Sequence, residues 1–190
     1  GDWSSDVCSS DLSCGQPALH QEVRIDSPDP ENIPGEILTK GPNVLLGYYK
    51  NDEATRQVLD ADGWFHTGDL GTMDSDNNVY IKGRSKNMLL GSNGQNIYPE
   101  EIEDKLSSLP LVSECLVVQR GDKLVGLVYP DLEEAKELGL NEVDIKNLME
   151  ENRKQLNEQM PAYCKLTDIE LLNEEFIKTP KRSIKRYLYK

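Results

Sequence analysis

The last 13 residues hold six cationic side chains and no acidic one: Lys178, Lys181, Arg182, Lys185, Arg186 and Lys190. Such a group is typical either of a local anion site or of a solvated basic helix, and the tail composition alone favours the helix. The chain as a whole carries a formal charge of -13. This charge argues against a general nucleic-acid binder, because binding to phosphates requires a cationic face that releases counterions.

The residues that most often bind metals or form disulfides stand at irregular spacing: Cys8, Cys14, Cys115, Cys164, His20 and His66. We therefore predict neither a zinc site nor a disulfide framework. The common short catalytic signatures are absent from the sequence, including the phosphate-binding P-loop and the nucleophile elbow. The run DSDNN at 74–78 begins like a calcium loop, but Val79 and Ser85 stand where that loop needs Gly and Glu, so a hairpin turn is expected.

Two kinds of pattern position these residues, and together they predict an α+β fold. From Glu22 to Arg84 short strand-like runs alternate with turn clusters, which indicates a small antiparallel or barrel-like β unit with one short helix at 51–59. We expect residues 1–12 to be foreign or disordered, because they show no periodicity. The predicted β-rich subdomain then covers 13–85.

After Lys86 the pattern changes to a compact α+β domain over 86–190. Its expected elements are a hairpin around 91–94, a helix opened by Pro99, a hairpin around 120–123, a helical region at 132–160 broken at Gly139, a strand at 168–172 and a basic helix from Arg182. No apolar run approaches the length that spans a bilayer, and the first residues do not resemble a signal peptide. We expect a cytoplasmic protein without a transmembrane segment, and we leave peripheral membrane contact and the oligomeric state open.

Three longer runs occur in a fixed order: GEILTKGPNVLLGYYKNDEAT at 35–55, GWFHTGDLG at 63–71 and GRSKNMLLGSNGQNIYPEEIE at 83–103. Together they resemble motifs of the AMP-forming acyl-CoA synthetases, within the family of acyl-adenylate-forming enzymes. The resemblance covers 13–190, and the last run is most similar to long-chain fatty acyl-CoA ligases. It implies a β-rich end of a large AMP-binding domain, followed by a C-terminal lid domain.

The resemblance also implies roles for individual residues. Asp69 would accept hydrogen bonds from the ribose hydroxyls of ATP, and Arg84 would contact the same nucleotide as a charged donor. Taken alone, Asp69 is more typical of a cap on a tight turn after Gly68, and Arg84 is typical of a solvated strand end. Ile81 would form a wall for the adenine, although packing in the core is an equal alternative. Lys86 would be the hinge whose backbone torsions move the lid domain.

Two further sites follow from the resemblance. Ser92 and Gly94 lie in the hairpin that would pack beside the pantetheine arm of CoA, although a plain hairpin turn explains them as well. The family ends with a pattern like TPxGKxxR, whose lysine stabilises charge during adenylation. Here Ser183, or Arg182 if a gap is placed, occupies the position of that lysine, and Lys181 or Lys185 are the candidates to replace it.

The resemblance predicts part of an acid-thiol ligase whose substrates are ATP, a fatty acid and CoA. Mg²⁺ would be bound mainly by upstream residues that this chain does not contain, and no other metal is expected. Because the acyl pocket also lies upstream, we expect the 190 residues alone to be inactive. Two alternatives stay open: a ligase for another carboxylate, such as an aryl or amino acid, and a non-catalytic module that binds a nucleotide or a partner.

Overall fold

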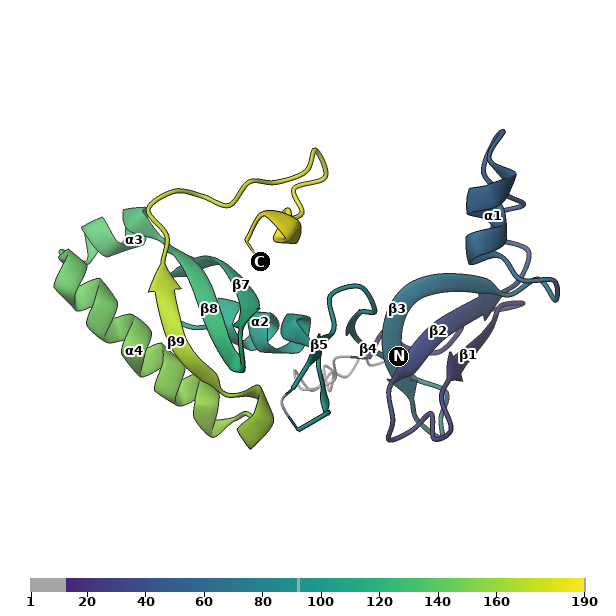
Figure 1. The fold of residues 1–190 in the computed structure, drawn as a ribbon, viewed down its shortest axis with the longest axis horizontal. Helices are drawn as coiled ribbons and strands as arrows, with labels where there is room; N and C mark the ends of the chain where they lie inside the picture. Colours follow the sequence, from purple (N-terminus) through teal and green to yellow (C-terminus); the bar gives the residue numbers. More distant parts are fainter. Residues whose placement is uncertain (1–12, 92, 190) are drawn as a thin grey trace, which may run out of the picture. The chain divides into compact units, whose positions relative to one another are not determined.

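A computed structural model of the chain describes residues 13–91 and 93–189. It divides into two compact units, Gly1–Lys86 and Asn87–Lys190, and each is described by itself (Figure 1). The expectation for residues 1–12 and the candidate role of Ser92 lie outside the described residues.

The first unit is built on one antiparallel sheet. Its strands are β1 (Glu22–Asp26), β2 (Gly35–Lys40), β3 (Phe65–Met73) and β4 (Val79–Arg84), in the order β1-β2-β3-β4. A short helix, α1 (Asp52–Val58), connects β2 to β3, and the Asn51 side chain caps it by accepting a hydrogen bond from the Ala54 N–H at 3.1 Å. The antiparallel form of the prediction and the short helix are therefore confirmed. The main cluster of buried apolar residues in this unit is small: Ile25, Ile37 and Val79.

The second unit begins with a two-stranded hairpin and continues with a three-stranded sheet. Its elements are β5 (Leu89–Leu90), β6 (Asn96–Ile97), α2 (Pro99–Ser107), β7 (Val112–Arg120), β8 (Lys123–Pro130), α3 (Leu132–Glu137), α4 (Glu142–Glu158), η1 (Ala162–Cys164), β9 (Leu166–Leu171) and η2 (Arg186–Leu188). Strands β7 and β8 form an antiparallel hairpin, and β9 returns parallel to β8 after α3 and α4. A parallel return needs such a helical crossover. The α+β fold class is confirmed.

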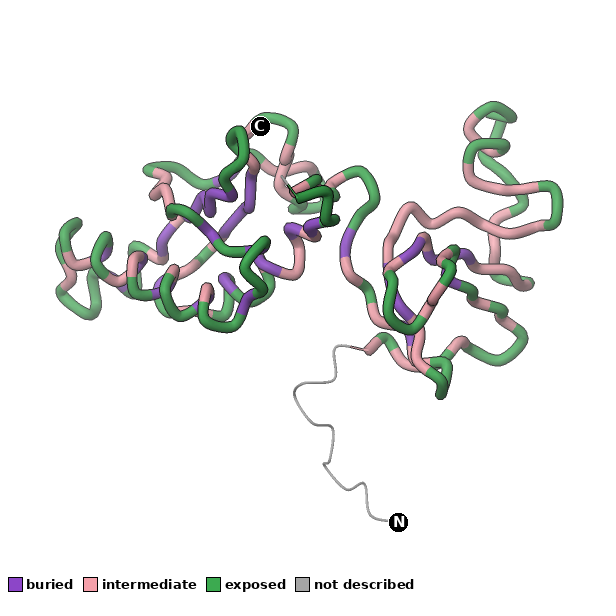
Figure 2. Tube along the Cα trace, turned by 60° about the horizontal axis from the view of Figure 1, so that its bottom comes forward, coloured by how far each residue is buried: buried purple, intermediate pink, exposed green. Residues whose placement is uncertain are grey.

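Alternate residues of the three-stranded sheet face two different layers. Cys115 and Val117 of β7 belong to the core that the sheet shares with the helices, which includes buried side chains of α2, α3 and α4. Leu116 and Val118 lie on the opposite face, in a cluster with Phe176 from the C-terminal tail. Within the second unit, Figure 2 shows buried positions along the strands and on one side of α4. The sheet is thus covered by helices on one face and by the C-terminal tail on the other.

The break between α3 and α4 follows the sequence signals. Gly139 has φ 69°, a left-handed conformation that favours glycine, and Asn141 then starts α4 with a capping box to Asp144. Helix α4 buries Ile145, Met149 and Leu156, as the helical spacing predicts. Among the described residues, no helix combines the length and apolar character that crossing a membrane requires.

Two predicted elements differ from the structure. Strand β9 begins at Leu166, two residues before the predicted start, because the Asn157 side chain exchanges hydrogen bonds of 2.8 and 2.9 Å with the Leu166 backbone. The predicted basic helix from Arg182 is wrong. Arg182 has φ 63°, which an α-helix does not accommodate, and in the tail up to residue 189 the one helical segment is the short 3-10 helix η2.

Candidate functional site

Asp69 lies at an irregularity where β3 runs past β2. Leu38 pairs with His66 and Glu36 pairs with Leu70, so three residues of β3 lie opposite Ile37 alone. Extra residues of this kind bend a strand away from its ladder and can change the direction of a side chain. The sequence run Thr67, Gly68 and Asp69 therefore forms a bulge rather than a regular part of the strand.

Side chains of β2 and β3 hold this bulge in place. The Thr67 hydroxyl donates a hydrogen bond to the Ile37 carbonyl at 2.7 Å and accepts one from the Asp69 N–H at 3.0 Å. Glu36 accepts a hydrogen bond from the Gly68 N–H at 3.0 Å, and its other carboxylate oxygen lies 2.9 Å from His66 Nδ1. Gly68 has φ 72°, a conformation that a side chain would strain.

The structure brings Asp69 and Arg84 together. The two residues are register partners on β3 and β4, and Arg84 Nε lies 2.7 Å from Asp69 Oδ1. Arg84 is the last residue of β4 and its side chain is 61% exposed, so it is a solvated strand end that also forms an ion pair with Asp69. Ile81, on the same strand, is 52% exposed, so the alternative that it packs in the core is wrong. An acceptor carboxylate, a cationic donor and an exposed apolar side chain thus lie on two neighbouring strands.

Lys86 is exposed and is the last residue of the first unit. Its role as a hinge stays a prediction.

The hairpin of β5 and β6 borders a hollow of about 610 Å³ within the second unit. Gly91, Asn93 and Ile97 line one side, and Tyr163 and Lys165 are among the residues that line it from η1 and β9. Gly94, at the turn, has φ 78° and supports the hairpin through a hydrogen bond from its N–H to the Gly91 carbonyl at 2.8 Å. The volume is in the range of small-molecule sites.

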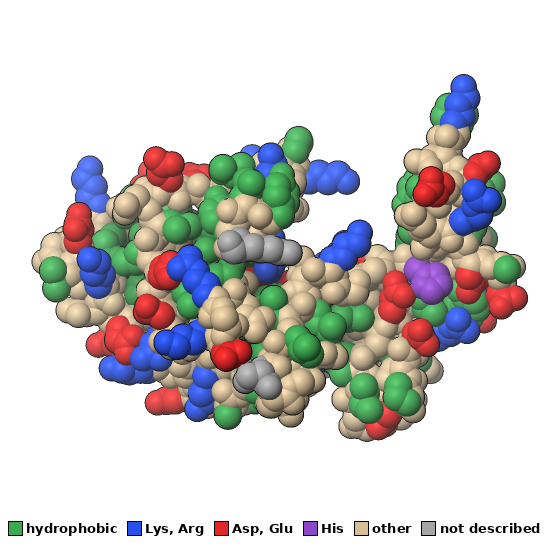
Figure 3. All heavy atoms as spheres, in the orientation of Figure 1, with side chains coloured by type: hydrophobic (Ala, Val, Ile, Leu, Met, Phe, Trp, Pro, Cys, Tyr) green, Lys and Arg blue, Asp and Glu red, His purple; other side chains and the backbone are tan. Residues whose placement is uncertain are grey.

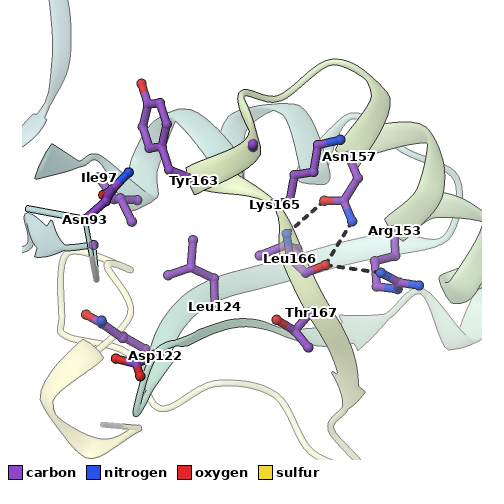
Figure 4. A pocket seen from close by; sticks show the side chains of 13 residues that line it. Asn93, Ile97, Asp122, Leu124, Arg153, Asn157, Tyr163, Lys165, Leu166 and Thr167 are labelled. Atoms are coloured by element: carbon purple, nitrogen blue, oxygen red, sulfur yellow. Dashed lines mark hydrogen bonds between the residues drawn. The ribbon is translucent and has the colours of Figure 1, made fainter. Parts of the chain in front are cut away.

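Residues of α4 and the start of β9 line another part of this hollow. Figure 4 shows the side chains of Arg153 and Asn157 reaching the backbone of Leu166, with Arg153 Nη1 at 3.2 Å from the Leu166 carbonyl oxygen. The Lys165 side chain is exposed, and Tyr163 is 40% exposed. An aromatic ring and a cation at the border of one hollow suit a ligand that has both an aromatic and an anionic part.

The C-terminal tail is anchored by two ion pairs rather than solvated as a helix. Lys178 pairs with Glu114 of β7, and Arg186 pairs with Glu103 of α2.

Between these two anchors the backbone forms a turn. The Arg182 N–H donates a hydrogen bond to the Thr179 carbonyl, and the Thr179 N–H donates one to the Ser183 carbonyl, both at 2.8 Å. The tail therefore presents a tight turn at 179–183.

The turn geometry bears on which residue occupies the lysine position of the family pattern. Arg182 has φ 63°, the conformation that the glycine before that lysine would adopt readily. This favours an alignment of the tail with the family pattern that has no gap. In that alignment Ser183, rather than Arg182, occupies the lysine position. Within the part of the chain that the structure describes, neither Lys181 nor Lys185 forms an ion pair, whereas Lys178 and Arg186 serve as anchors.

The strain at Arg182 leads to a first prediction. Replacing Arg182 with glycine is expected to stabilise the turn by about 1 kcal/mol, because a non-glycine residue pays a steric cost in the left-handed region. Amide exchange of Thr179 and Ser183 would measure the change as slower exchange. Arg182→Ala removes the same charge but keeps Cβ, so equal slowing in that variant would contradict the explanation by backbone strain.

Glu103 is a largely buried carboxylate between α2 and β7. It accepts a hydrogen bond from the Val117 N–H at 2.6 Å, and its side chain is only 14% exposed. Burial raises the pKa of Glu103 to about 7, although the Arg186 guanidinium and the Val117 N–H lower it. Burial also raises the pKa of the neighbouring Cys115 thiol to about 12, which keeps this thiol protonated and unreactive.

The sequence interpretation missed three glutamates that organise these sites: Glu36, Glu103 and Glu114. A usable signal existed for Glu36, which is followed directly by the apolar pair Ile37 and Leu38 in a strand-like run. Figure 3 shows basic and acidic side chains interspersed on the visible faces of each unit, so charge alone does not reveal these pairs.

Comparisons with known proteins give a consistent result. Residues 86–189 match the family described as AMP-binding enzyme C-terminal domain. The chain is 44% identical over 119 residues to 2-succinylbenzoate-CoA ligase of Bacillus cytotoxicus, a match that covers 61% of this chain and 24% of the relative. It is also 44% identical over 110 residues to feruloyl-CoA synthase of an Amycolatopsis species, covering 56% of this chain and 22% of the relative. The chain thus spans about a quarter of the length of these relatives.

Solved structures show the same relationship. The anthranilate CoA ligase AuaEII in complex with anthranoyl-AMP superposes with a TM-score of 0.77 and 26% identity, over 94% of this chain and 33% of that chain. The O-succinylbenzoate CoA synthetase of Bacillus subtilis, in complex with ATP and a magnesium ion, gives a TM-score of 0.73 at 24% identity, over 93% of this chain and 35% of that chain. The second similarity shows the fold alone.

Proposed function

This chain belongs to the family of AMP-binding enzymes through their C-terminal domain, and from that premise we propose that it is part of an AMP-forming acid-CoA ligase. Such an enzyme joins a carboxylate to the α-phosphate of ATP, which forms an acyl-adenylate and releases pyrophosphate. The thiol of CoA then attacks the acyl carbon, and AMP leaves. The names of the curated relatives, all acid-CoA ligases or synthases in the matches above, support this reaction class.

The observation that carries the proposal is the pair formed by Asp69 and Arg84. An ionised carboxylate at a bulge can accept hydrogen bonds from two adjacent hydroxyl groups, which matches the diol of a ribose. Arg84 supplies the donor that ribose oxygens and phosphates require. The exposed Ile81 on the same strand is available to contact the adenine ring. These three residues fit the nucleotide part of ATP or AMP.

The hollow beside the β5–β6 hairpin supports a role in CoA binding. Gly91 allows a ligand to approach the backbone closely, and Tyr163 and Lys165 offer an aromatic and a cationic contact. We propose that this hollow holds part of CoA, and that Gly94, in the turn of the same hairpin, lies beside the pantetheine arm, the role that the resemblance also gives to Ser92. Lys86 would be the hinge that allows the nucleotide and CoA contacts to form in different states.

For the cation that acts during adenylation, the turn geometry favours Lys185 over Lys181. Ile184 pairs with Lys178 and packs against the apolar cluster under the tail. Lys185 follows the turn at 179–183 and lies two residues after Ser183, whereas Lys181 lies within the turn. We therefore propose Lys185 as the residue that replaces the lysine of the family pattern.

We propose that Mg²⁺ is held mainly by residues outside this chain.

Two carboxylate classes are candidates for the substrate. The wording of the run at 92–103 favours a long-chain fatty acid, whereas the relatives are named for 2-succinylbenzoate and ferulate, which are aromatic carboxylates. The names of these relatives support the alternative of a carboxylate other than a fatty acid, and both classes stay candidates. The isolated 190 residues are expected to be inactive in either case, since both reactants must be held in one site.

Isothermal titration of AMP into the purified chain tests the ribose site. Asp69→Ala is expected to weaken AMP binding at least about tenfold, because the variant loses the charged acceptor for the ribose hydroxyls. Asp62→Ala, at an exposed position of the same unit, is the matched control and should bind AMP like the wild type. Equal affinity of the wild type and Asp69→Ala for AMP would remove Asp69 from the nucleotide site.

A further inference from the structure

Glu36 occupies an unusual place for a glutamate in a β-strand. It lies in β2 next to Ile37 and Leu38, and its side chain is only 28% exposed. Both carboxylate oxygens are directed to β3, where one accepts from the Gly68 N–H at 3.0 Å and the other lies 2.9 Å from His66 Nδ1. These two contacts bracket Thr67 and lie immediately before Asp69 in the chain.

A bulge loses ladder hydrogen bonds and must replace them. Opposite Ile37, the three residues of β3 cannot all pair with one residue of β2, so their N–H groups need other acceptors. Glu36 serves Gly68, and the Thr67 hydroxyl serves Asp69 at 3.0 Å. On the other side, the Gly68 carbonyl accepts from the Ser85 N–H at 3.0 Å, which connects the bulge to the residue after Arg84.

The bulge conformation, rather than lack of space, makes this support necessary. A Cβ placed on Gly68 would meet no atom within 4 Å, and glycine adopts φ 72° and many other conformations readily, so a contact from outside the bulge is needed to select this one. A charged acceptor makes a stronger hydrogen bond to an N–H group than a neutral one does. The Glu36 carboxylate is therefore suited to hold Gly68 in this conformation.

We propose that Glu36 is a positioning residue for the ribose site: it fixes the bulge at Gly68 and thereby holds Asp69 opposite Arg84. This inference rests on the proposed function, because it assigns Asp69 to the nucleotide. Glu36 acts through Gly68 and does not itself contact the ligand. A glutamate that only formed an ion pair with His66 would have no effect on the geometry of Asp69.

Three variants distinguish a positioning role of Glu36 from a role limited to the ion pair with His66. Glu36→Ala removes both contacts, Glu36→Gln keeps an oxygen that can accept from the Gly68 N–H, and Glu22→Ala changes an exposed glutamate of the same sheet. AMP affinity is measured by isothermal titration, and exchange of the Gly68 N–H and the Arg84 Nε–H by NMR. Circular dichroism checks that each variant retains the fold.

We expect Glu36→Ala to weaken AMP binding about tenfold and to speed exchange of both protons by a similar factor. Glu36→Gln should restore both readouts to within about threefold of the wild type, since the acceptor for Gly68 is kept. Glu22→Ala should match the wild type. Unchanged AMP affinity in Glu36→Ala, or a loss in Glu36→Gln as large as in Glu36→Ala, would overturn the proposal.

The results differ if this chain does not bind AMP at all. If the wild type binds no AMP, the ribose site of this chain is not supported, and the exchange data alone decide the positioning role. Fast exchange of the Arg84 Nε–H in Glu36→Ala, rescued in Glu36→Gln, would show that Glu36 holds the Asp69–Arg84 pair. Exchange that is the same in all variants would overturn this role as well.

Discussion

Replacing Glu103 with glutamine is expected to remove a fall of about 3 kcal/mol in the free energy of unfolding between pH 4.5 and about pH 7. The pKa of Glu103 is raised from 4.5 to about 7 in the folded chain, so the folded state binds the proton more tightly than the unfolded state does. The stabilising contribution is complete below pH 4.5 and is lost as the pH rises to about 7. Glutamine cannot titrate and should show no such loss.

The cause is the desolvation of a carboxylate between α2 and β7. Glu103 follows the fully buried Ile102, and its neighbour Glu100 adds a like charge that raises the pKa further. The Arg186 guanidinium and the Val117 N–H oppose this effect without cancelling it. The charged form is therefore retained near neutral pH only because these two donors are present.

Urea unfolding at several pH values between 4.5 and 7.5 would measure this effect. Other carboxylates also titrate over part of this range, so the informative quantity is the difference between wild type and Glu103→Gln at each pH. Glu151→Gln, at an exposed position of α4, is the matched control and should run parallel to the wild type. A Glu103→Gln curve that is parallel to the wild type would show that Glu103 has an ordinary pKa.

Local patterns in the sequence predicted the regular elements well. The hairpin of β7 and β8 and the apolar stripe of α4 follow from periodicities of two and about 3.6 residues, which depend only on neighbouring positions. The start of β9 could not be predicted in this way. It depends on Asn157, which lies in the preceding helix and holds the backbone of Leu166.

Site residues could be predicted where they belong to a sequence motif of the family. They could not be predicted where the residue they contact lies far away in the sequence. Asp69 and Arg84 were found through the runs that contain them, and the structure places them 2.7 Å apart. Arg186 lies 83 positions after Glu103 in the sequence, and composition alone favoured a solvated basic helix for the tail. Counting charges cannot detect a pair whose two members lie so far apart in the sequence.

Replacing Arg186 with methionine is expected to destabilise the second unit by about 2 kcal/mol at pH 8, because it leaves the Glu103 carboxylate buried without its cation. Methionine keeps much of the apolar volume of the arginine side chain, so the loss reports mainly on charge. At pH 5.5 the cost should be smaller, since Glu103, with its pKa near 7, is then largely protonated and needs no counter-ion.

The double variant Arg186→Met with Glu103→Gln separates the pair from its surroundings. If the cost of Arg186→Met comes from the unpaired carboxylate, adding Glu103→Gln should recover most of the lost stability at pH 8 and change little at pH 5.5. Lys181→Met, at an exposed position of the same tail, removes a cation without removing an anchor and should leave the unfolding curve unchanged. A cost for Arg186→Met that is equal at both pH values, and that Glu103→Gln does not recover, would mean that Arg186 anchors the tail by packing rather than by neutralising Glu103.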